Sequence, residues 1–202
     1  MTTTAKLAVA TSILMLFLGM LIGQQATKEK YQFRVPDYIV YTPKETKQKV
    51  EIRNTLMTTY ALHITKADWL ADNVLIAHQI YGTPIEIMLA LISVESEFDE
   101  FAKSSSNAIG FTQVMPSVWG NEIPYDIYNP AQNILAGAHI LNNYKTECGN
   151  WECALKAYNV GITNYKNGKE KSAAKRYVNK IKVELKRLLL ANSNFKGDLK
   201  RG

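Results

Sequence analysis

The sequence has few of the residues that bind metals or form a disulfide framework. It contains two cysteines and three histidines in 202 residues. Cys148 and Cys153 are five positions apart, and there is no other cysteine to complete a zinc site. His63, His78 and His139 show no metal-ligand spacing with them. The sequence therefore predicts neither a metal site nor a cofactor.

The two cysteines flank a short stretch, Gly149-Asn150-Trp151-Glu152, between two expected helices. A disulfide between Cys148 and Cys153 would fit an oxidising compartment. Two free, half-buried thiols are the alternative. A catalytic thiol is less favoured than either, because no histidine partner is evident in the sequence.

Internal repeats and convincing strand patterns are also missing, so we predict an all-α domain. Hydrophobic residues make up 47% of the chain and charged residues 21%, which is typical of a globular protein with a core. The net charge of +6 favours an anionic partner such as nucleic acid, a membrane surface or an acidic wall polymer. The basic residues are not interleaved with aromatic residues on a strand pattern, so we expect no nucleic-acid binding.

Residues 7–23 are uncharged and mostly apolar, a length between that of a signal-peptide core and a short membrane-spanning helix. No clear small-x-small cleavage site follows, which favours an uncleaved anchor. Lys6 precedes the run and Lys28, Lys30 and Arg34 follow it, so charge placement gives no support for export. We expect residues 1–25 to be a signal-anchor or signal peptide.

Residues 26–65 are expected to form a linker, polar up to about Lys49, followed by a short helix from Val50 to Tyr60. Apolar residues then recur at helical spacing from Lys66 to Tyr81, and Gly82 ends that pattern.

The stretch that follows is the most informative in the chain. Thr83-Pro84-Ile85-Glu86 has the form of a helix start, with Thr83 as the cap and proline at the first position. Residues 87–92 are apolar on every side, which indicates a helix buried all round. Glu95 lies at its end, where contact with apolar surface would raise the pKa of a carboxyl group and suit a proton donor. The alternative is that Glu95 is simply the first solvated residue past a core helix.

Three more helices are expected towards the C-terminus. Asn129 before Pro130 indicates a capped helix start, and Gly137 inside that helix suggests close packing against another helix. A short helix is expected from Trp151 to Tyr158. The last begins near Ser172, after a basic loop, and its apolar positions are Ala174, Tyr177, Ile181, Leu185 and Leu188.

Three blocks of this sequence resemble the family 1 lytic transglycosylases, relatives of goose-type lysozyme. The family's central motif reads roughly E-S-x-F, then a serine, then G-x-x-Q-x-M-P. It is matched in order and spacing by Glu95, Ser96, Phe98, Ser104, Gly110, Gln113, Met115 and Pro116. Residues 129–141 resemble the family's N-I-x-x-G-x-x-x-L helix, and residues 154–161 resemble its A-L-x-A-Y-N-x-G block. Three blocks in the right order make a chance resemblance unlikely.

The resemblance implies a lysozyme-like helical domain, here residues 66–192, followed by a basic tail at 193–202. It also implies cleavage of the bond between N-acetylmuramic acid and N-acetylglucosamine in peptidoglycan. Glu95 would be the sole acid and base, first protonating the glycosidic oxygen and then deprotonating the muramoyl 6-hydroxyl. This closes a 1,6-anhydro ring, so a second carboxylate is not required.

The resemblance also implies the residues that bind substrate or support Glu95. They are Ser104, Gln113, Met115, Tyr158, Asn159 and Tyr177. For several of them a purely structural role is a fair alternative: Ser104 as a loop serine, and Met115 and Tyr177 as core residues. Two positions depart from the family pattern. Asn107 replaces a glycine but tolerates a left-handed backbone, and Thr112 replaces a methionine.

We therefore expect a periplasmic enzyme, anchored in the inner membrane through residues 7–23 or exported, that acts on peptidoglycan glycan strands. Minimal enzymes of this kind commonly serve secretion, conjugation or phage envelope complexes. Two rival readings stay open. One is a hydrolytic muramidase in which Asp99, on the Glu95 face if the helix continues, assists a water molecule. The other is an inactive, wall-binding component of an envelope complex.

Overall fold

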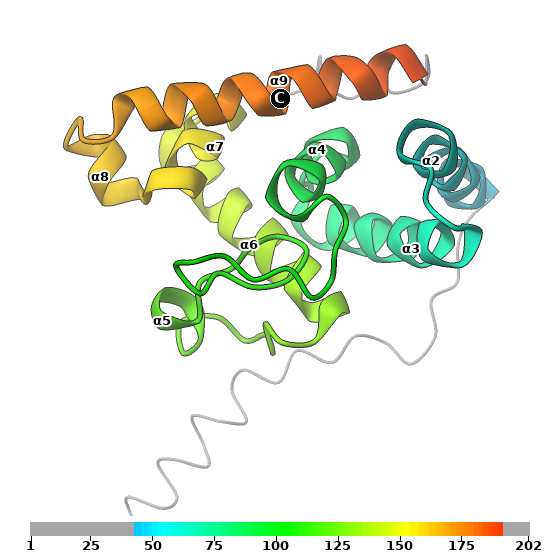
Figure 1. Ribbon diagram of the computed structural model, residues 1–202, viewed down its shortest axis with the longest axis horizontal. Helices are drawn as coiled ribbons and strands as arrows, with labels where there is room; N and C mark the ends of the chain where they lie inside the picture. Colours follow the sequence, from blue (N-terminus) through cyan, green and yellow to red (C-terminus); the bar gives the residue numbers. More distant parts are fainter. Residues whose placement is uncertain (1–42, 192–202) are drawn as a thin grey trace, which may run out of the picture. The chain divides into compact units, whose positions relative to one another are not determined.

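The computed structural model describes residues 43–191, and these are mostly helical. The helices are α2 (Pro43–Tyr60), α3 (Ile64–Tyr81), α4 (Ile85–Ser96), α5 (Pro116–Trp119), α6 (Pro130–Cys148), α7 (Trp151–Val160), α8 (Ile162–Lys166) and α9 (Lys171–Ala191) (Figure 1). Within the described residues there is no strand longer than the isolated bridges that Ile109 makes with Lys103 and Val114. The prediction of an all-α domain is confirmed.

Helix α4 lies at the centre of the molecule, beneath α9 and beside α3 (Figure 1). Its residues from Ile85 to Ile92 are all buried, as the continuous apolar run predicts. The helix ends at Ser96, because Glu97 and Phe98 both adopt left-handed backbone angles, with φ of 52° and 64°. A rigid, fully buried support therefore carries Glu95 in its last turn.

The start of α4 differs from the prediction that Thr83 caps it. The cap position is Pro84, which makes no side-chain cap hydrogen bond. The hydroxyl of Thr83 is instead buried and donates to the carbonyl of Ala138 at 3.5 Å. Thr83 thus joins α4 to α6, a contact that a local cap pattern cannot reveal.

The N-terminal helix is longer than predicted. Residues 43–49, assigned to a polar linker, form the first turns of α2. Lys49 pairs there with Asp68 at 3.0 Å and Asp72 at 2.9 Å, both on α3. These ion pairs hold the first turns of α2, which have no clear helical spacing of apolar residues, against α3. Tertiary contacts therefore decide the helix here, and the local sequence pattern does not.

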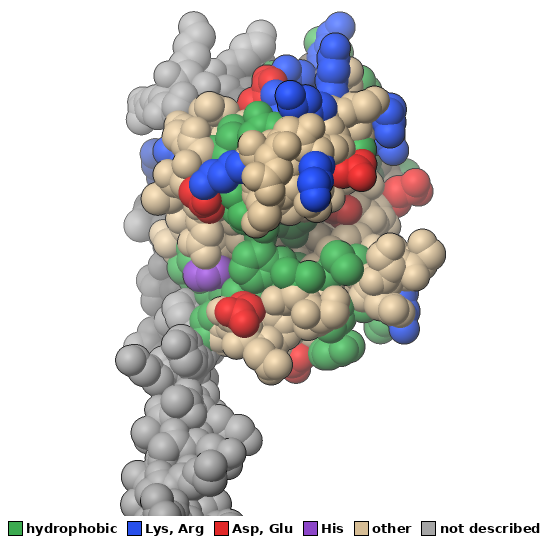
Figure 2. Space-filling view, turned by 90° about the vertical axis from the view of Figure 1, so that its left-hand side faces the viewer, with side chains coloured by type: hydrophobic (Ala, Val, Ile, Leu, Met, Phe, Trp, Pro, Cys, Tyr) green, Lys and Arg blue, Asp and Glu red, His purple; other side chains and the backbone are tan. Residues whose placement is uncertain are grey.

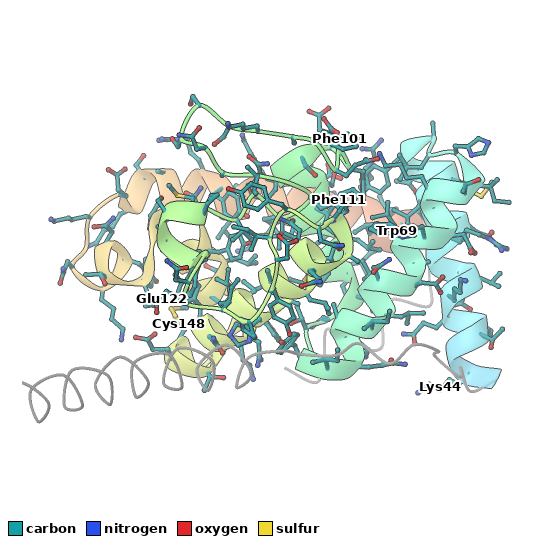
Figure 3. The ribbon with its side chains drawn as sticks, turned by 90° about the horizontal axis from the view of Figure 1, so that it is seen from below. Lys44, Trp69, Phe101, Phe111, Glu122 and Cys148 are labelled. Carbon is teal, nitrogen blue, oxygen red and sulfur yellow. A yellow bond between two sulfur atoms is a disulfide. The ribbon has the colours of Figure 1, made fainter. Side chains whose placement is uncertain are left out.

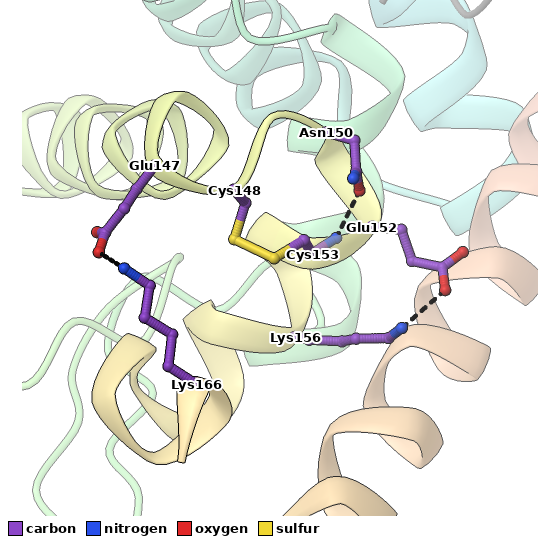
Figure 4. The surroundings of a disulfide bond; sticks show 7 residues. All are labelled: Glu147, Cys148, Asn150, Glu152, Cys153, Lys156 and Lys166. Carbon is purple, nitrogen blue, oxygen red and sulfur yellow. Dashed lines mark hydrogen bonds and ion pairs between the residues drawn. A yellow bond between two sulfur atoms is a disulfide. The ribbon is translucent and has the colours of Figure 1, made fainter. Parts of the chain in front are cut away.

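The turn between α6 and α7 contains a disulfide between Cys148 and Cys153, so the disulfide prediction is confirmed (Figure 4). Asn150 caps α7 by accepting a hydrogen bond from the amide of Cys153 at 2.9 Å. Ion pairs between Glu147 and Lys166, and between Glu152 and Lys156, lie on either side of it. At the other end of α6, Asn129 accepts from the amides of Ala131 and Gln132, as the cap pattern predicts.

Between residues 43 and 191 no helix is both long and apolar enough to cross a membrane. The run at residues 7–23, expected to be an anchor or signal segment, lies outside the described residues. So do most of the expected linker and the expected basic tail at 193–202.

Candidate active site

The carboxyl group of Glu95 is half-buried and hydrogen-bonded to a residue from the other end of the domain. The hydroxyl of Tyr177, on α9, donates to its Oε1 at 2.5 Å. Tyr177 is itself buried. Tyr177 therefore lies next to the acid and also in the core, the two alternatives that its sequence pattern left open.

Burial raises the pKa of Glu95 from 4.5 to about 7, although the hydrogen bond from Tyr177 and the charge of Lys180 lower it. Loss of hydration disfavours the charged carboxylate, and here that effect outweighs the two groups that favour it. A carboxyl group with a pKa of about 7 exists in both forms near neutral pH. It can therefore donate a proton and then accept one.

Tyr158, on α7, lies close enough to this carboxyl group to be affected by its charge. Burial, together with the negative charge of Glu95, raises the pKa of both Tyr158 and Tyr177 well above the usual value for tyrosine. Tyr158 does not bond to the carboxyl group; its hydroxyl donates to the backbone carbonyl of Thr112 at 2.8 Å. Both tyrosines therefore remain neutral hydrogen-bond donors around Glu95.

A loop from Glu97 to Met115 forms the next part of the site, and its conformation depends on left-handed residues. Asn107 has φ of 63°, as the sequence analysis expected of the asparagine that replaces glycine, and Gln113 has φ of 50°. The side-chain amide of Gln113 donates to the carbonyls of Ala102 and Gly110, both at 3.0 Å. Since its amide hydrogens are used in the loop, Gln113 offers a ligand mainly its carbonyl oxygen.

Ser104 also organises the loop. Its Oγ accepts hydrogen bonds from the amides of Ser106 at 3.2 Å and Ala108 at 3.0 Å. Because both contacts use the oxygen as acceptor, the hydroxyl hydrogen is left to donate. The structure thus places Ser104 in a turn, the role the sequence analysis gave as its alternative.

Asn133, on α6, fixes this loop and was missed as a site-forming residue. It is fully buried. Its Oδ1 accepts from the amide of Thr112 at 2.9 Å, and its Nδ2 donates to the carbonyls of Ile109 and Ile127, both at 3.0 Å. Asn133 lies within the N-I-x-x-G match, which is the only sequence signal that could have identified it.

Two glycines let the loop approach α6 this closely. A Cβ on Gly110, which has φ of 74°, would lie 2.6 Å from the Asn133 side chain. A Cβ on Gly137 would lie 2.6 Å from the side chain of Thr112. Gly137 is thus in close packing as predicted, but against the loop rather than another helix. Thr112, noted for replacing methionine, is buried and donates to the carbonyl of Asn133 at 2.8 Å.

The remaining predicted residues lie at the edges of these elements. Met115 is half-buried and occupies the cap position of α5. Asn159 is exposed in the last turn of α7. Neither contacts Glu95 through a hydrogen bond in the described part of the chain.

Asp99 does not share the Glu95 face, contrary to the conditional expectation of another helical turn. The helix ends three residues earlier, and Asp99 Oδ1 accepts from the backbone amide of Phe101 at 2.9 Å. Asp99 is exposed and fixes the turn that follows α4.

Phe101, presented by this turn, lies with Phe111 and Trp69 around an apolar pocket of about 500 Å³ (Figure 3). The rings of Trp69 and Phe111 are 5.7 Å apart, so the loop packs on α3 through this pair.

A larger pocket of about 690 Å³ opens beside the last turn of α4. Its lining residues come from the ends of α2 and α4 and from α9, and they include Ser93, Glu97 and Lys180. Glu184 lies in its wall, where it accepts hydrogen bonds from Tyr60 at 2.8 Å and Ser93 at 3.1 Å. No group of three or more His, Cys, Asp or Glu side chains within residues 43–191 could hold a metal ion.

Comparison with known proteins identifies the family of this chain. The family model described as the Transglycosylase SLT domain matches residues 72–181, which include Glu95, Tyr158 and Tyr177.

Similar curated proteins include the membrane-bound lytic murein transglycosylase C of Glaesserella parasuis, which is 37% identical over 79 residues, or 33% of this chain. The protein of the same name from Actinobacillus pleuropneumoniae is 35% identical over 95 residues, or 42% of this chain. These matches span only 21% and 23% of the length of the relatives.

Among solved structures, the 70 kDa soluble lytic transglycosylase of Escherichia coli superimposes with a TM-score of 0.51 and 18% identity. That match covers 73% of this chain and 30% of the other, and it supports the lysozyme-like fold. Since the family model covers more than half of the chain and contains the residues around Glu95, this chain belongs to the Transglycosylase SLT family.

Proposed function

We propose that this protein cleaves peptidoglycan glycan strands by lytic transglycosylation. The bond broken is the β-1,4 linkage between N-acetylmuramic acid and N-acetylglucosamine, and the product ends in 1,6-anhydro-N-acetylmuramic acid. The observation that carries the proposal is the half-buried carboxyl group of Glu95, with a pKa of about 7 and a hydrogen bond from Tyr177. The names of the relatives, lytic murein transglycosylases, support the same reaction.

In the first step the protonated carboxyl group of Glu95 donates its proton to the glycosidic oxygen. The bond from that oxygen to the muramoyl C1 breaks, and N-acetylglucosamine leaves with a free 4-hydroxyl. Burial keeps a large fraction of Glu95 protonated near neutral pH, which this step requires.

In the second step the Glu95 carboxylate accepts the proton of the muramoyl 6-hydroxyl, and the freed oxygen bonds to C1. Glu95 regains the proton it gave up, and no water is consumed. Because the attacking hydroxyl belongs to the same sugar, proximity replaces the second carboxylate that a hydrolase normally needs. Tyr177, which bonds to the carboxylate, and the charge of Lys180 favour the ionised form that this step uses.

We propose supporting roles for the other residues of the site. Tyr158 fixes the loop through Thr112 and remains a neutral neighbour of Glu95. Ser104, with its hydroxyl hydrogen left to donate, and Gln113, with its carbonyl oxygen, would hydrogen-bond at the carboxylate or the sugars. Met115 and Asn159 would line the saccharide cleft at the edges of α5 and α7.

A hydrolytic muramidase is the nearest alternative, but the position of Asp99 gives it little support. That carboxylate is exposed and engaged with the amide of Phe101, past the end of α4. An inactive wall-binding protein is the alternative from another class. A purely binding role would not need an acid with its pKa raised to about 7 at the end of a core helix.

The test is mass spectrometry of the soluble products that the full chain releases from purified peptidoglycan. We expect 1,6-anhydromuropeptides from the natural protein and a loss of at least about a thousandfold in rate for Glu95→Gln. Glu97→Gln, which removes an exposed carboxylate two residues away, is the matched control and should retain activity. Wall binding without products from the natural protein would favour the inactive alternative, and reducing ends would favour hydrolysis.

We extend the proposal to the place and role of the enzyme. It would act in the periplasm, held at the inner membrane by residues 7–23 or exported, and open the wall locally for an envelope-spanning system or during phage entry. The name "membrane-bound" of the relatives supports a membrane location. Fractionation of cells that make the full chain tests this part: recovery in the cytoplasmic fraction would contradict it.

A further inference from the structure

The whole net positive charge of the chain lies in helix α9. Seven of the 24 Lys and Arg residues lie in it, against one of the 18 Asp and Glu residues. The rest of the sequence therefore has 17 of each and no net charge, while α9 alone has the full +6. The proposed reaction uses only Tyr177 and Lys180 from this helix, so it leaves most of this charge unexplained.

The exposed side of α9 has an ordered arrangement. At 100° per residue, Ser172, Asn179, Val183 and Leu190 form a strip opposite the buried residues. Cations flank this strip in two rows: Lys171, Lys175, Lys182 and Lys186 on one side, and Arg176, Lys180 and Arg187 on the other. We call the strip and its two rows the α9 face.

Two features distinguish the α9 face from an ordinary solvated helix surface. Within residues 43–191, only Lys182 and Arg187 among its cations form ion pairs, with Glu152 and Glu184. The aliphatic side chains between the rows are strongly exposed, with Val183 at 65% and Leu190 at 79% of their full area. Figure 2 shows Lys and Arg side chains gathered on the upper part of the molecule, where α8 and α9 meet.

A pocket of about 580 Å³ beside the first row extends this cationic region onto α7 and α8. Five lysines line it, Lys156 and Lys166 together with Lys171, Lys175 and Lys182 of the α9 face, against a single carboxylate, Glu152. An anionic partner is therefore favoured over an area wider than the helix itself.

We propose that the α9 face lies on the surface of an anionic lipid bilayer. Lipid headgroups of negative charge would meet the two rows of cations, and Val183 and Leu190 would enter the boundary between headgroups and acyl chains. The long lysine and arginine stems suit this arrangement, since they keep the charge at headgroup level while their carbons cover apolar surface. A soluble polyanion would match the cations but would leave the aliphatic residues between them in water. This inference does not depend on the proposed reaction.

The test uses the full chain with Val183→Cys or Leu190→Cys labelled by an environment-sensitive fluorophore. The protein is mixed with vesicles of phosphatidylcholine, with or without phosphatidylglycerol, that contain lipid with brominated acyl chains as quencher. We expect strong quenching at both positions only when phosphatidylglycerol is present. A label at Tyr128→Cys, exposed in the segment before α6, should remain unquenched.

A double variant, Lys175→Gln with Lys186→Gln, tests the charge. Each cation near an anionic bilayer contributes roughly a fivefold change, so the ratio of quenched to unquenched label should fall roughly twenty-five-fold. Lys44→Gln with Lys47→Gln removes the same charge from exposed positions of α2 and should leave the ratio unchanged. Equal quenching in neutral and anionic vesicles would overturn the proposal. The proposal would also be overturned if the fluorescence of the label responded to soluble polyphosphate but not to anionic vesicles.

Discussion

At the scale of single residues, the protonation state of Glu95 is set by opposing effects. Burial disfavours the carboxylate, while Tyr177 and Lys180 favour it, and burial prevails. Since the proposed first step needs the protonated form, kcat/KM should fall as pH rises through the pKa of about 7. The pH profile of the reaction therefore reports on this one group.

Tyr177→Phe should move the alkaline limb of that profile to higher pH. The substitution removes a hydrogen bond that stabilises the Glu95 carboxylate, so the pKa of Glu95 rises further. We expect a shift of about one pH unit and a lower maximum rate, because the second step loses its support. The measurement is kcat/KM for peptidoglycan from pH 5 to pH 9, with Tyr128→Phe as an exposed control. An unchanged limb would mean that Glu95 is not the group titrating.

The same pKa makes a prediction about stability. The folded state holds the Glu95 proton more tightly than the unfolded chain does, in which the pKa of Glu95 is 4.5. The contribution of this proton to the free energy of unfolding is therefore fully present below about pH 4.5. It is lost as pH rises through about 7, where the folded protein must bury a charged carboxylate. Glu95→Gln should therefore stabilise the protein by on the order of 2–3 kcal/mol at pH 8 and by almost nothing at pH 4.

Urea denaturation of the natural protein and of Glu95→Gln at these two pH values gives the comparison. Glu97→Gln changes an exposed carboxylate and should have little effect at either pH. A difference between the natural protein and Glu95→Gln that does not depend on pH would contradict the pKa assignment.

At the scale of elements, the site depends on how the loop from Glu97 to Met115 is attached to α6. Asn133 is the attachment, because its buried side chain bonds to Thr112, Ile109 and Ile127 together. Asn133→Ala would remove the hydrogen-bond partners of the Thr112 amide and the Ile127 carbonyl, while the Ile109 carbonyl keeps its hydrogen bond from the amide of Val114 at 3.1 Å. We expect a loss of about 3 kcal/mol in the free energy of unfolding. Activity should fall as well, because the loop also positions Tyr158.

Thermal and urea unfolding with an activity assay at low temperature test this attachment. Asn143→Ala, at an exposed position of the same helix, is the matched control and should be nearly neutral. Full activity in a folded Asn133→Ala protein would show that the loop does not need this clamp.

The α6–α7 turn supports a second prediction at this scale. A disulfide that closes so short a loop, with a sequence separation of 5, should contribute about 2 kcal/mol by restricting the unfolded chain. Replacing Cys148 and Cys153 together by serine should lower stability by that amount. Reductant should lower the stability of the natural protein equally and leave the double variant unchanged. Sensitivity of the variant to reductant would contradict this account.

These elements show how far sequence reasoning reaches. The buried run of α4 and the Asn129 cap of α6 are local patterns, and both were predicted correctly. Of the apolar positions predicted on α9, all are buried except Leu185, which is half-buried. The predictions for residues 43–49, expected to be a linker, and for Thr83, expected to be a helix cap, were wrong. In both cases contacts with another helix decide the conformation.

The same limit applies to the site. The position of Glu95 at the end of α4 could be predicted from the sequence, since the apolar run points to it. Its hydrogen bond with Tyr177 joins residues 82 positions apart, and a helical period gives only the face on which Tyr177 lies. Asn133 is harder still, because its neighbours give no reason to place its amide against a loop.

At the scale of the whole molecule, charge and chemistry are arranged around α9. Its buried side provides Tyr177 for the acid at the end of α4, and its exposed side has the net charge of the chain. If the α9 face rests on a bilayer, the helix whose Tyr177 bonds to the Glu95 carboxyl group also fixes how far that carboxyl group lies from the membrane. The proposed reaction and the proposed membrane contact can fail separately, since the reaction uses Tyr177 on the buried side and the membrane contact uses the exposed side, with Lys180 alone contributing to both.

The central claim is that Glu95 drives an intramolecular transfer in which water takes no part. Digestion of peptidoglycan by the full chain in water enriched in heavy oxygen, followed by mass spectrometry of the muropeptides, tests it most directly. The account predicts 1,6-anhydro ends with no heavy oxygen in the natural protein and no products from Glu95→Gln. Heavy oxygen at the newly formed muramoyl ends would mean that water attacks C1, and the lytic mechanism would have to be replaced by hydrolysis.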